Sequence, residues 1–201
     1  MTYEEVRRMV LELANQYSIA GEPISPAYNN QSDDLHKIPS LLNQAIMDIR
    51  TGVKPLRSVC ELGREDAPGW AELPEDFWRL VSGGVRKVDG GGAPRPCNRC
   101  QISGGRRIWL SPGHYLVEYE RYPEQLPVNP ADTYTLEEDP EVLQAAAFFA
   151  AAHLVRTDDA FSFAALQNEY ERRLSRMVPR VTAEFLPVQD AYGAYEEGGG
   201  I

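Results

Sequence analysis

The first hydrophobic stripe of the chain recurs at helical spacing. Thr2 and Glu5 have the spacing of a capping box, in which each side chain accepts a hydrogen bond from a free backbone amide of the first turn. The pattern therefore predicts an amphipathic helix over residues 2 to about 17. Its apolar face consists of Val6, Met9, Val10, Leu13 and Tyr17.

A second stripe follows a segment rich in Gly, Pro, Ser and Asn, which is typical of a loop. Ser32, Asp33 and Asp34 are all favourable N-cap residues, and Gly52 and Pro55 are typical of a helix end. The sequence predicts a second helix between them. Its apolar face consists of Ile38, Leu41, Leu42, Ala45, Ile46 and Ile49.

From residue 53 to residue 127 the helical periodicity disappears, Gly and Pro are frequent, and short alternating runs take over. "LRSVCEL" is one candidate strand, and "RRIWLS" and "HYLVEYERY" are stronger ones. Pro112 and Gly113 between the last two have the order of a type II turn, so we expect a β-hairpin there. In its second strand Tyr115, Val117 and Tyr119 share one face, which we expect to be the buried one.

The most apolar stretch, "QAAAFFAAAHLV", follows Asp139 and Pro140, which suit an N-cap and the first helical position. A helix that is apolar on several faces is surrounded by protein. Residues 157–159 interrupt it, and an amphipathic helix follows with Phe163, Leu166 and Tyr170 on one face. We expect a helical hairpin whose alanine-rich member is central, packed by its partner, by the two N-terminal helices and by the β-hairpin.

These elements predict a mainly α architecture of the α+β type, a bundle of about four helices with an inserted β-hairpin arm. We expect one domain over residues 1–178, with its β region at about 56–127, and an extended C-terminal arm over residues 179–201. The arm lacks periodicity and places isolated apolar residues among Gly and Glu, as in a segment that orders on a partner. Those residues are Phe185, Leu186, Val188, Tyr192 and Tyr195.

Charge and composition narrow the classes of function. The chain of 201 residues has a net charge of −10 and a pI near 4.8, which disfavours a surface that grips nucleic-acid phosphates. No stretch has the roughly 18 continuous apolar residues of a membrane span, and the start does not resemble a signal peptide. Three cysteines fit a reducing compartment better than a disulfide framework. We expect a protein made and kept in the cytosol, without membrane contact.

Candidate catalytic groups are few. The sequence has no phosphate-binding loop, no nucleophile elbow and no histidine pair at metal spacing. His153 is best interpreted as a core or interface histidine, and residues 137–139 as favourable charges at a helix N-terminus. Trp70, Phe77 and Trp78 are best interpreted as anchors of an irregular segment. We expect no enzyme activity and no cofactor, with a small hydrolase as a remote alternative.

One motif has metal-site spacing. Cys97 and Cys100 form a CxxC pair, and His114 and Cys60 are conceivable third and fourth zinc ligands. A second CxxC is missing, and a single pair in a Gly- and Pro-rich segment is more often two thiols across a tight turn. A zinc-dependent or thiol-dependent accessory or regulatory protein is therefore the alternative from another class.

The order of segments resembles the head-tail connector, or adaptor, proteins of tailed bacteriophages, the family that includes the head-completion proteins. The resemblance rests on the N-terminal helix pair, "LPEDFWRL", "VEYERYPEQLP", the acidic step "YTLEEDPEVLQ", and "AAAFFAAAHLVRTDDAFSFAALQNEYERRL". It covers residues 1–177. The chain departs from the family in its Cys97 and Cys100 insertion.

This resemblance implies a structural virion protein at the head-tail interface, present in the host cytoplasm during assembly. It implies a twelvefold ring beneath the portal and a C-terminal arm that docks on the portal. A tail or stopper protein would follow below, and genomic DNA would pass without sequence-specific contact. An acidic channel suits that passage, because strong attraction to phosphates would retain the genome.

Overall fold

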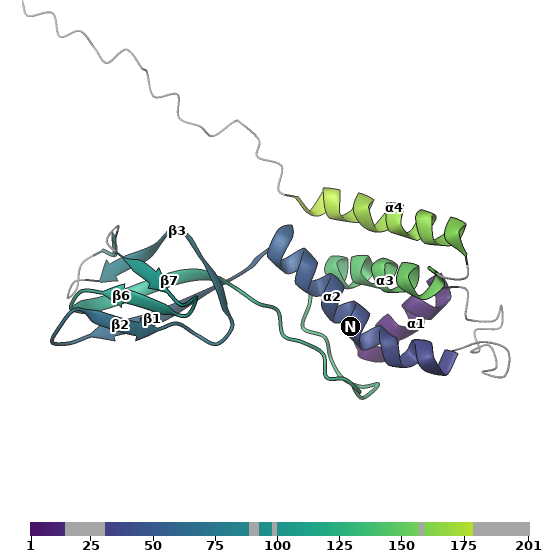
Figure 1. The fold of residues 1–201 in the computed structure, drawn as a ribbon, viewed down its shortest axis with the longest axis horizontal. Coiled ribbons are helices and arrows are strands. Elements are labelled where there is room, and N and C mark those ends of the chain that lie inside the picture. The colour runs from purple at the N-terminus through teal and green to yellow at the C-terminus, as the bar shows by residue number, and fades with distance from the viewer. Residues whose placement is uncertain (15–30, 89–92, 98–99, 157–158, 179–201) are drawn as a thin grey trace, which may run out of the picture.

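The computed structural model describes residues 1–14, 31–88, 93–97, 100–156 and 159–178. It consists of a helical lobe and a β lobe that lie side by side along the long axis of the molecule (Figure 1). The helical lobe contains α1 (Tyr3–Leu13), α2 (Gln31–Gly52), α3 (Pro140–Val155) and α4 (Ala160–Met177). The chain enters the β lobe after α2 and returns after the last strand.

The β lobe is a two-layered structure of seven described strands. A four-stranded antiparallel sheet has the order β1-β7-β3-β4, and a three-stranded antiparallel sheet has the order β2-β6-β5. The bounds are β1 Leu56–Arg64, β2 Gly69–Glu72, β3 Phe77–Val88, β4 Arg95–Pro96, β5 Gln101–Ser103, β6 Arg107–Leu110 and β7 Gly113–Arg121.

The prediction of a mainly α bundle with a hairpin arm is therefore wrong, and the fold is α+β with two antiparallel sheets. The physical reason is that each sheet has one apolar face, and the two faces bury each other. Residues from both sheets, including Ile108 of β6 and Val117 of β7, form one hydrophobic cluster. A region with its own core no longer needs to lie on the helices as an arm.

The expected hairpin between β6 and β7 is also wrong. The two strands are adjacent in sequence but belong to different sheets, so residues 111–112 carry the chain from one layer to the other. The Tyr115 hydroxyl lies 2.6 Å from Ser111 Oγ and donates to the Ser111 carbonyl at 3.1 Å, which holds this crossover in place. The predicted alternation is confirmed, because Tyr115, Val117 and Tyr119 are all buried.

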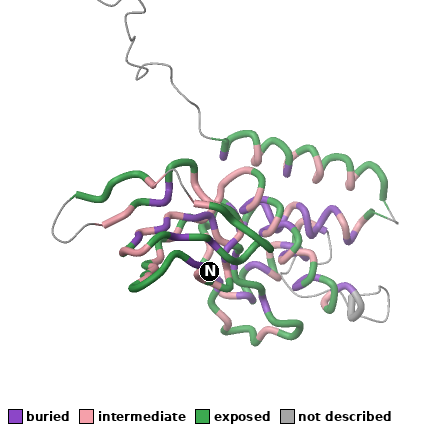
Figure 2. The backbone as a smooth tube through the Cα atoms, turned by 60° about the vertical axis from the view of Figure 1, so that its left-hand side comes forward, coloured by how far each residue is buried: buried purple, intermediate pink, exposed green. Residues whose placement is uncertain are grey.

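The helical lobe is built around α3. Its alanines are fully buried, and α1, α2 and α4 all contact it, which confirms its central position. Figure 2 shows buried positions along α3, whereas α4 is exposed on its outer side. The expected contact between α3 and the β region is wrong, because the core cluster of the helical lobe contains no strand residue.

The N-terminus of α1 and the C-terminus of α2, at Gly52, agree with the sequence pattern. The predicted N-cap of α2 is wrong, because the helix begins at Gln31 and Ser32, Asp33 and Asp34 lie inside it. Thr2 and Glu5 form the predicted capping box, with the Thr2 amide donating to Glu5 Oε2 at 2.9 Å and the Glu5 amide to Thr2 Oγ1 at 3.3 Å. Tyr17 lies outside the described residues. Pro39 lies inside α2, one residue after the fully buried Ile38. No helix in the described part of the chain is long and apolar enough to cross a membrane.

Candidate interaction sites

The acidic step before α3 is tied to the end of α2. Arg50, whose side chain is only 4 % exposed, donates from Nε to Glu138 Oε2 at 2.9 Å and from a terminal nitrogen to Asp139 Oδ2 at 3.1 Å. Lys54 Nζ lies 3.0 Å from the same Asp139 oxygen. The Lys54 hydrogen bond, followed by that of Arg50, holds the pKa of Asp139 below its usual range. These acids join two helices, a role that the prediction of helix N-terminal charges did not contain.

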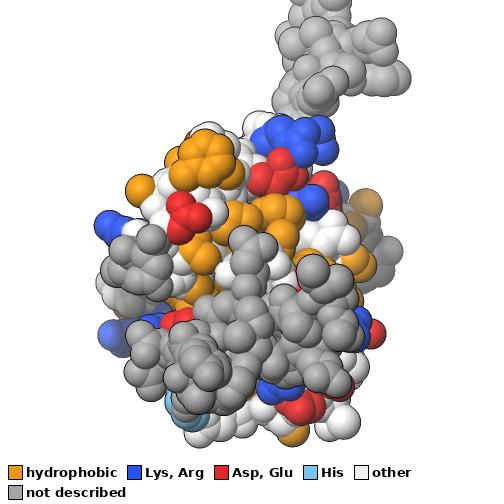
Figure 3. Space-filling view, turned by 90° about the vertical axis from the view of Figure 1, so that its right-hand side faces the viewer, with side chains coloured by type: hydrophobic (Ala, Val, Ile, Leu, Met, Phe, Trp, Pro, Cys, Tyr) orange, Lys and Arg blue, Asp and Glu red, His pale blue; other side chains and the backbone are white. Residues whose placement is uncertain are grey.

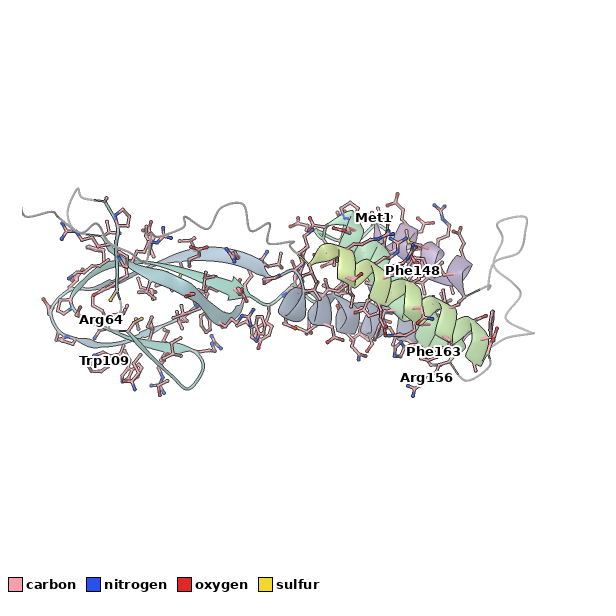
Figure 4. The ribbon with its side chains drawn as sticks, turned by 90° about the horizontal axis from the view of Figure 1, so that it is seen from above. Met1, Arg64, Trp109, Phe148, Arg156 and Phe163 are labelled. Carbon is pink, nitrogen blue, oxygen red and sulfur yellow. The ribbon has the colours of Figure 1, made fainter. Side chains whose placement is uncertain are left out.

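His153 is half-buried within the helical lobe. Its Nδ1 lies 3.0 Å from the carbonyl oxygen of Phe149, and its ring lies 4.1 Å from the Phe149 ring between centroids. The Phe163 ring approaches from α4, and Arg156 lies over Phe163 at 5.9 Å (Figure 4). The histidine is thus packed and hydrogen-bonded between α3 and α4, as the sequence predicted.

The three aromatic residues of "GWAELPEDFWRL" have different surroundings. Phe77 is buried against Tyr119 at 5.7 Å between ring centroids, and it is the predicted anchor. Trp78 lies under the Arg79 guanidinium at 4.2 Å. Trp70 is 38 % exposed and contacts Trp109 edge-to-face at 5.3 Å on the outer side of the small sheet, so for Trp70 the anchoring interpretation is wrong.

The four conceivable zinc ligands are not brought together. Cys60 and His114 lie in neighbouring strands, but Cys60 pairs with the buried Val117, whereas His114 is exposed and precedes the buried Tyr115. They therefore lie on opposite faces of the large sheet. No group of three or more metal-ligating side chains occurs among the residues that the structure describes.

The thiols of the CxxC pair are partly buried. Cys97 and Cys100 pack against the core of the β lobe, and Cys100 Sγ lies 3.7 Å from the Cys97 carbonyl oxygen. Burial raises the pKa of Cys100, and the neighbouring Cys97 adds to that effect. Burial also raises the pKa of Cys60, with a further contribution from Asp76. Both shifts disfavour the thiolate form of these two side chains.

A cleft of about 630 Å³ opens where the two lobes meet. Met47 of α2 lines one side, and Asp76, Arg121 and Tyr122 of the β lobe line the other. Asp76 accepts a hydrogen bond from Tyr119 Oη at 3.0 Å, so it serves to hold the base of the sheet. The cleft is charged and open to solvent. Among the residues that the structure describes there, no nucleophile lies beside a general base.

Charge is unevenly divided between the lobes. Residues 56–121 contain ten Lys and Arg against nine Asp and Glu, although the whole chain carries −10. The acidic excess therefore lies outside the β lobe, and most of it outside the helices: residues 122–139 contain five Asp and Glu and no Lys or Arg, and residues 179–201 contain four acids against one Arg. At the far end of the helical lobe, hydrophobic side chains lie among charged ones on the visible surface (Figure 3), and Phe161 at the start of α4 is 84 % exposed.

The five apolar residues predicted to bind the portal, Phe185, Leu186, Val188, Tyr192 and Tyr195, lie outside the described residues. The surface aromatic pair of Trp70 and Trp109 was missed from the sequence. Two tryptophans in separate strands would have been a signal only if the pairing of those strands had been known.

Comparison with known proteins identifies no family. No protein-family model and no curated protein matches the sequence. Among solved structures, the chain is similar to one in the neck of an empty GTA particle computed with C6 symmetry, with 17 % sequence identity and a TM-score of 0.28. The match covers 87 % of this chain and 91 % of that chain.

Proposed function

We propose that this protein is a structural virion protein, a head-tail adaptor that assembles as a ring beneath a portal and joins the DNA-filled capsid to the tail. In this proposal the ring is twelvefold and the chain is not an enzyme and needs no cofactor. Its partners are the portal, further copies of itself and a tail or stopper protein. Its place is the virion, after assembly in the host cytoplasm.

The proposal rests on where the fold places the segments that resemble those of head-tail connector proteins. The helical hairpin "AAAFFAAAHLVRTDDAFSFAALQNEYERRL" supplies the centre of the helical lobe, and the N-terminal helices pack on it. "LPEDFWRL" and "VEYERYPEQLP" both lie at the base of the β lobe, where Phe77 meets Tyr119. The acidic step "YTLEEDPEVLQ" contains the partners of Arg50. Segments far apart in sequence thus form the joint between two lobes.

The division of charge supports the same proposal. The acidic excess lies outside the β lobe, chiefly in the segment 122–139, which packs on the helical lobe through Leu126 and Leu136, so the helical side of a ring would present a negative lumen. DNA phosphates would be repelled rather than held by such a surface. The proposal therefore assigns the helical lobe to the channel side and leaves the β lobe to contact other proteins.

The C-terminal segment is proposed as the portal anchor. It carries five apolar or aromatic residues among Gly and acids, a composition that cannot form a core of its own. α4, which precedes it, ends at Met177 and packs on α3. We therefore expect removal of the segment to leave the core of the described residues intact.

The test is co-sedimentation with portal particles of the same virus. Full-length protein should bind and appear as a ring on the portal by negative-stain imaging. Protein lacking residues 179–201 should retain its melting temperature and lose binding. As a matched control, Phe185→Ala with Tyr192→Ala should weaken binding, whereas Gly198→Ala with Gly199→Ala should not. Absence of any portal binding by the full-length chain would contradict the function, and equal binding by the truncated chain would contradict only the anchor.

A further inference from the structure

We propose that β1 is a self-association edge through which two copies of this chain form a two-fold dimer. β1 is the terminal strand of the large sheet, with β7 as its only partner among the described strands. The backbone groups on its other side form no backbone hydrogen bond within the described part of the chain. An unpaired edge of this kind is a template for a further strand.

The other three sheet edges are blunted, whereas β1 is not. β4 has only two residues and includes Pro96, β5 has three residues, and β2 has four. Short strands and prolines are the usual means by which proteins prevent edge pairing. β1 has nine residues and pairs with β7 in unbroken register from Leu56 to Arg64, without a bulge or a proline. It is the long, regular edge of this sheet.

The side chains of β1 favour the β1 strand of a second copy of this chain as the strand that pairs with its free edge. Its outward face presents Arg57, Val59 and Glu61 in alternate positions, and Val59 is 59 % exposed. In an antiparallel pair centred on Val59, the two Val59 side chains lie opposite each other. Arg57 of each copy then faces Glu61 of the other, so the pairing contains two opposite-charge pairs.

In the same register, the side chains on the inner face of β1 also lie opposite compatible partners. Ser58 would face Cys60 of the second copy, and Leu56 would face Leu62, which already packs against the core of the β lobe. A pair centred on residue 57 or residue 61 would place two arginines or two glutamates opposite each other, which is destabilising. The antiparallel register centred on Val59 is therefore favoured, because it is the one that places Arg57 directly opposite Glu61.

The ion pairs within one copy allow Arg57 to take part in this dimer. Arg57 is 61 % exposed and lies 3.8 Å from Glu118, which is also within 3.7 Å of Arg86. Arg57 can thus turn to a second copy while Arg86 continues to neutralise Glu118. An edge pairing of one strand buries little area, so the dimer should be weak and concentration-dependent. This dimer is two-fold and is separate from the ring of the proposed function.

The experiment is sedimentation velocity of full-length protein over a concentration series. We expect a monomer-dimer equilibrium for the natural sequence. Arg57→Glu and Glu61→Arg each place like charges across the edge, and each should raise the dimer Kd by about tenfold or more. The double variant Arg57→Glu with Glu61→Arg restores opposite charges in the same register and should return the Kd to within about threefold of the natural value.

A crosslinking measurement tests the register independently. In a background with all three cysteines changed to serine, Val59→Cys should give a covalent dimer with a short bis-maleimide, whereas Val128→Cys, which is 82 % exposed elsewhere, should not. Melting curves of each variant establish that it is folded. The inference is overturned if the natural protein stays monomeric throughout the series, if the double variant fails to recover association, or if both cysteine variants crosslink equally.

Discussion

The cores of the two lobes are packed with side chains of opposite size. The helical lobe surrounds α3, where six fully buried alanines let three other helices approach closely. The β lobe fills the space between its sheets with large side chains such as Phe77, Tyr115 and Tyr119. A core of small side chains has no room for added volume, whereas a core between sheets depends on register. Each lobe should therefore fail under a different kind of substitution.

The largest effect is expected from a charge in the helical core. Ala147 has no exposed surface, so Ala147→Glu would bury a carboxylate without a partner and should destabilise the protein by about 4 kcal/mol or more. Denaturant unfolding followed by far-UV circular dichroism measures this loss. Ala164→Glu on the exposed side of α4 is the control and should change stability by less than about 0.5 kcal/mol. An unchanged midpoint for Ala147→Glu would contradict the central position of α3.

The next largest effect is expected at the joint between α2 and α3. Arg50→Met removes the buried guanidinium and leaves Glu138, whose side chain is only 11 % exposed, without its counter-charge. The expected loss is about 3–5 kcal/mol in thermal or denaturant unfolding. Arg172→Met removes an exposed ion pair with Glu169 and should cost at most about 1 kcal/mol. If the two variants were equally stable, the Arg50 contacts would not join the helices.

A third effect is expected at the bulge in β3 of the β lobe, where an added side chain should lower the stability. Between Leu80 and Val85, β3 has extra residues opposite β7, and a Cβ on Gly84 would lie 2.4 Å from the backbone oxygen of Glu118. Backbone cannot give way cheaply, so Gly84→Ala should destabilise by about 2–3 kcal/mol. Gly63→Ala in the same sheet meets its nearest atom at 3.5 Å and is the control. Thermal unfolding of both variants, with near-UV circular dichroism as the probe of the aromatic core, checks the prediction.

The smallest effect is expected on the outer face of the small sheet. Trp109→Ala removes an edge-to-face contact with Trp70, and both rings are more than a third exposed. The loss should be about 1 kcal/mol, because little of either ring is withdrawn from water. Tryptophan fluorescence during unfolding measures it, and Val128→Ala serves as the exposed control. A loss as large as that of Ala147→Glu would place this pair in a core that the structure does not contain.

Local pattern was sufficient for the helices. The capping box of Thr2 and Glu5, the apolar face of α2 and the central place of α3 all follow from spacing and side-chain size, which act within one or two turns. The alternation in β7 was equally readable, because inward and outward positions alternate whatever the partner strand is. Glu120 was an exception, since it is buried beside Arg79, a residue of another strand.

Pairing between strands was not readable. Ile108 and Leu110 of β6 and Tyr115 and Val117 of β7 carry the same inward pattern whether the strands form a hairpin or lie in facing sheets. The Pro112-Gly113 sequence suits a tight turn, and that local preference favoured the hairpin. The facing arrangement prevails because it buries both apolar faces at once.

The candidate sites also fall into two groups, those that could be predicted from local sequence and those that depend on the arrangement of strands. His153 was correctly interpreted, because its apolar helix already implied burial. The relation of Cys60 to His114 depends on the face of a sheet that the residues share or do not share, and the open edge of β1 depends on strand order.

The sequence by itself determined the helices, the capping box of α1, the burial of α3 and the excess of acid, since each depends on residues within a few positions or on composition alone. Only the tertiary structure decided that the β region has a core of its own, that Arg50 meets Glu138 and that β1 is left at an edge. Those features join residues tens of positions apart, and many chain paths satisfy the same local pattern. Burial of apolar surface across the whole chain selects one of them.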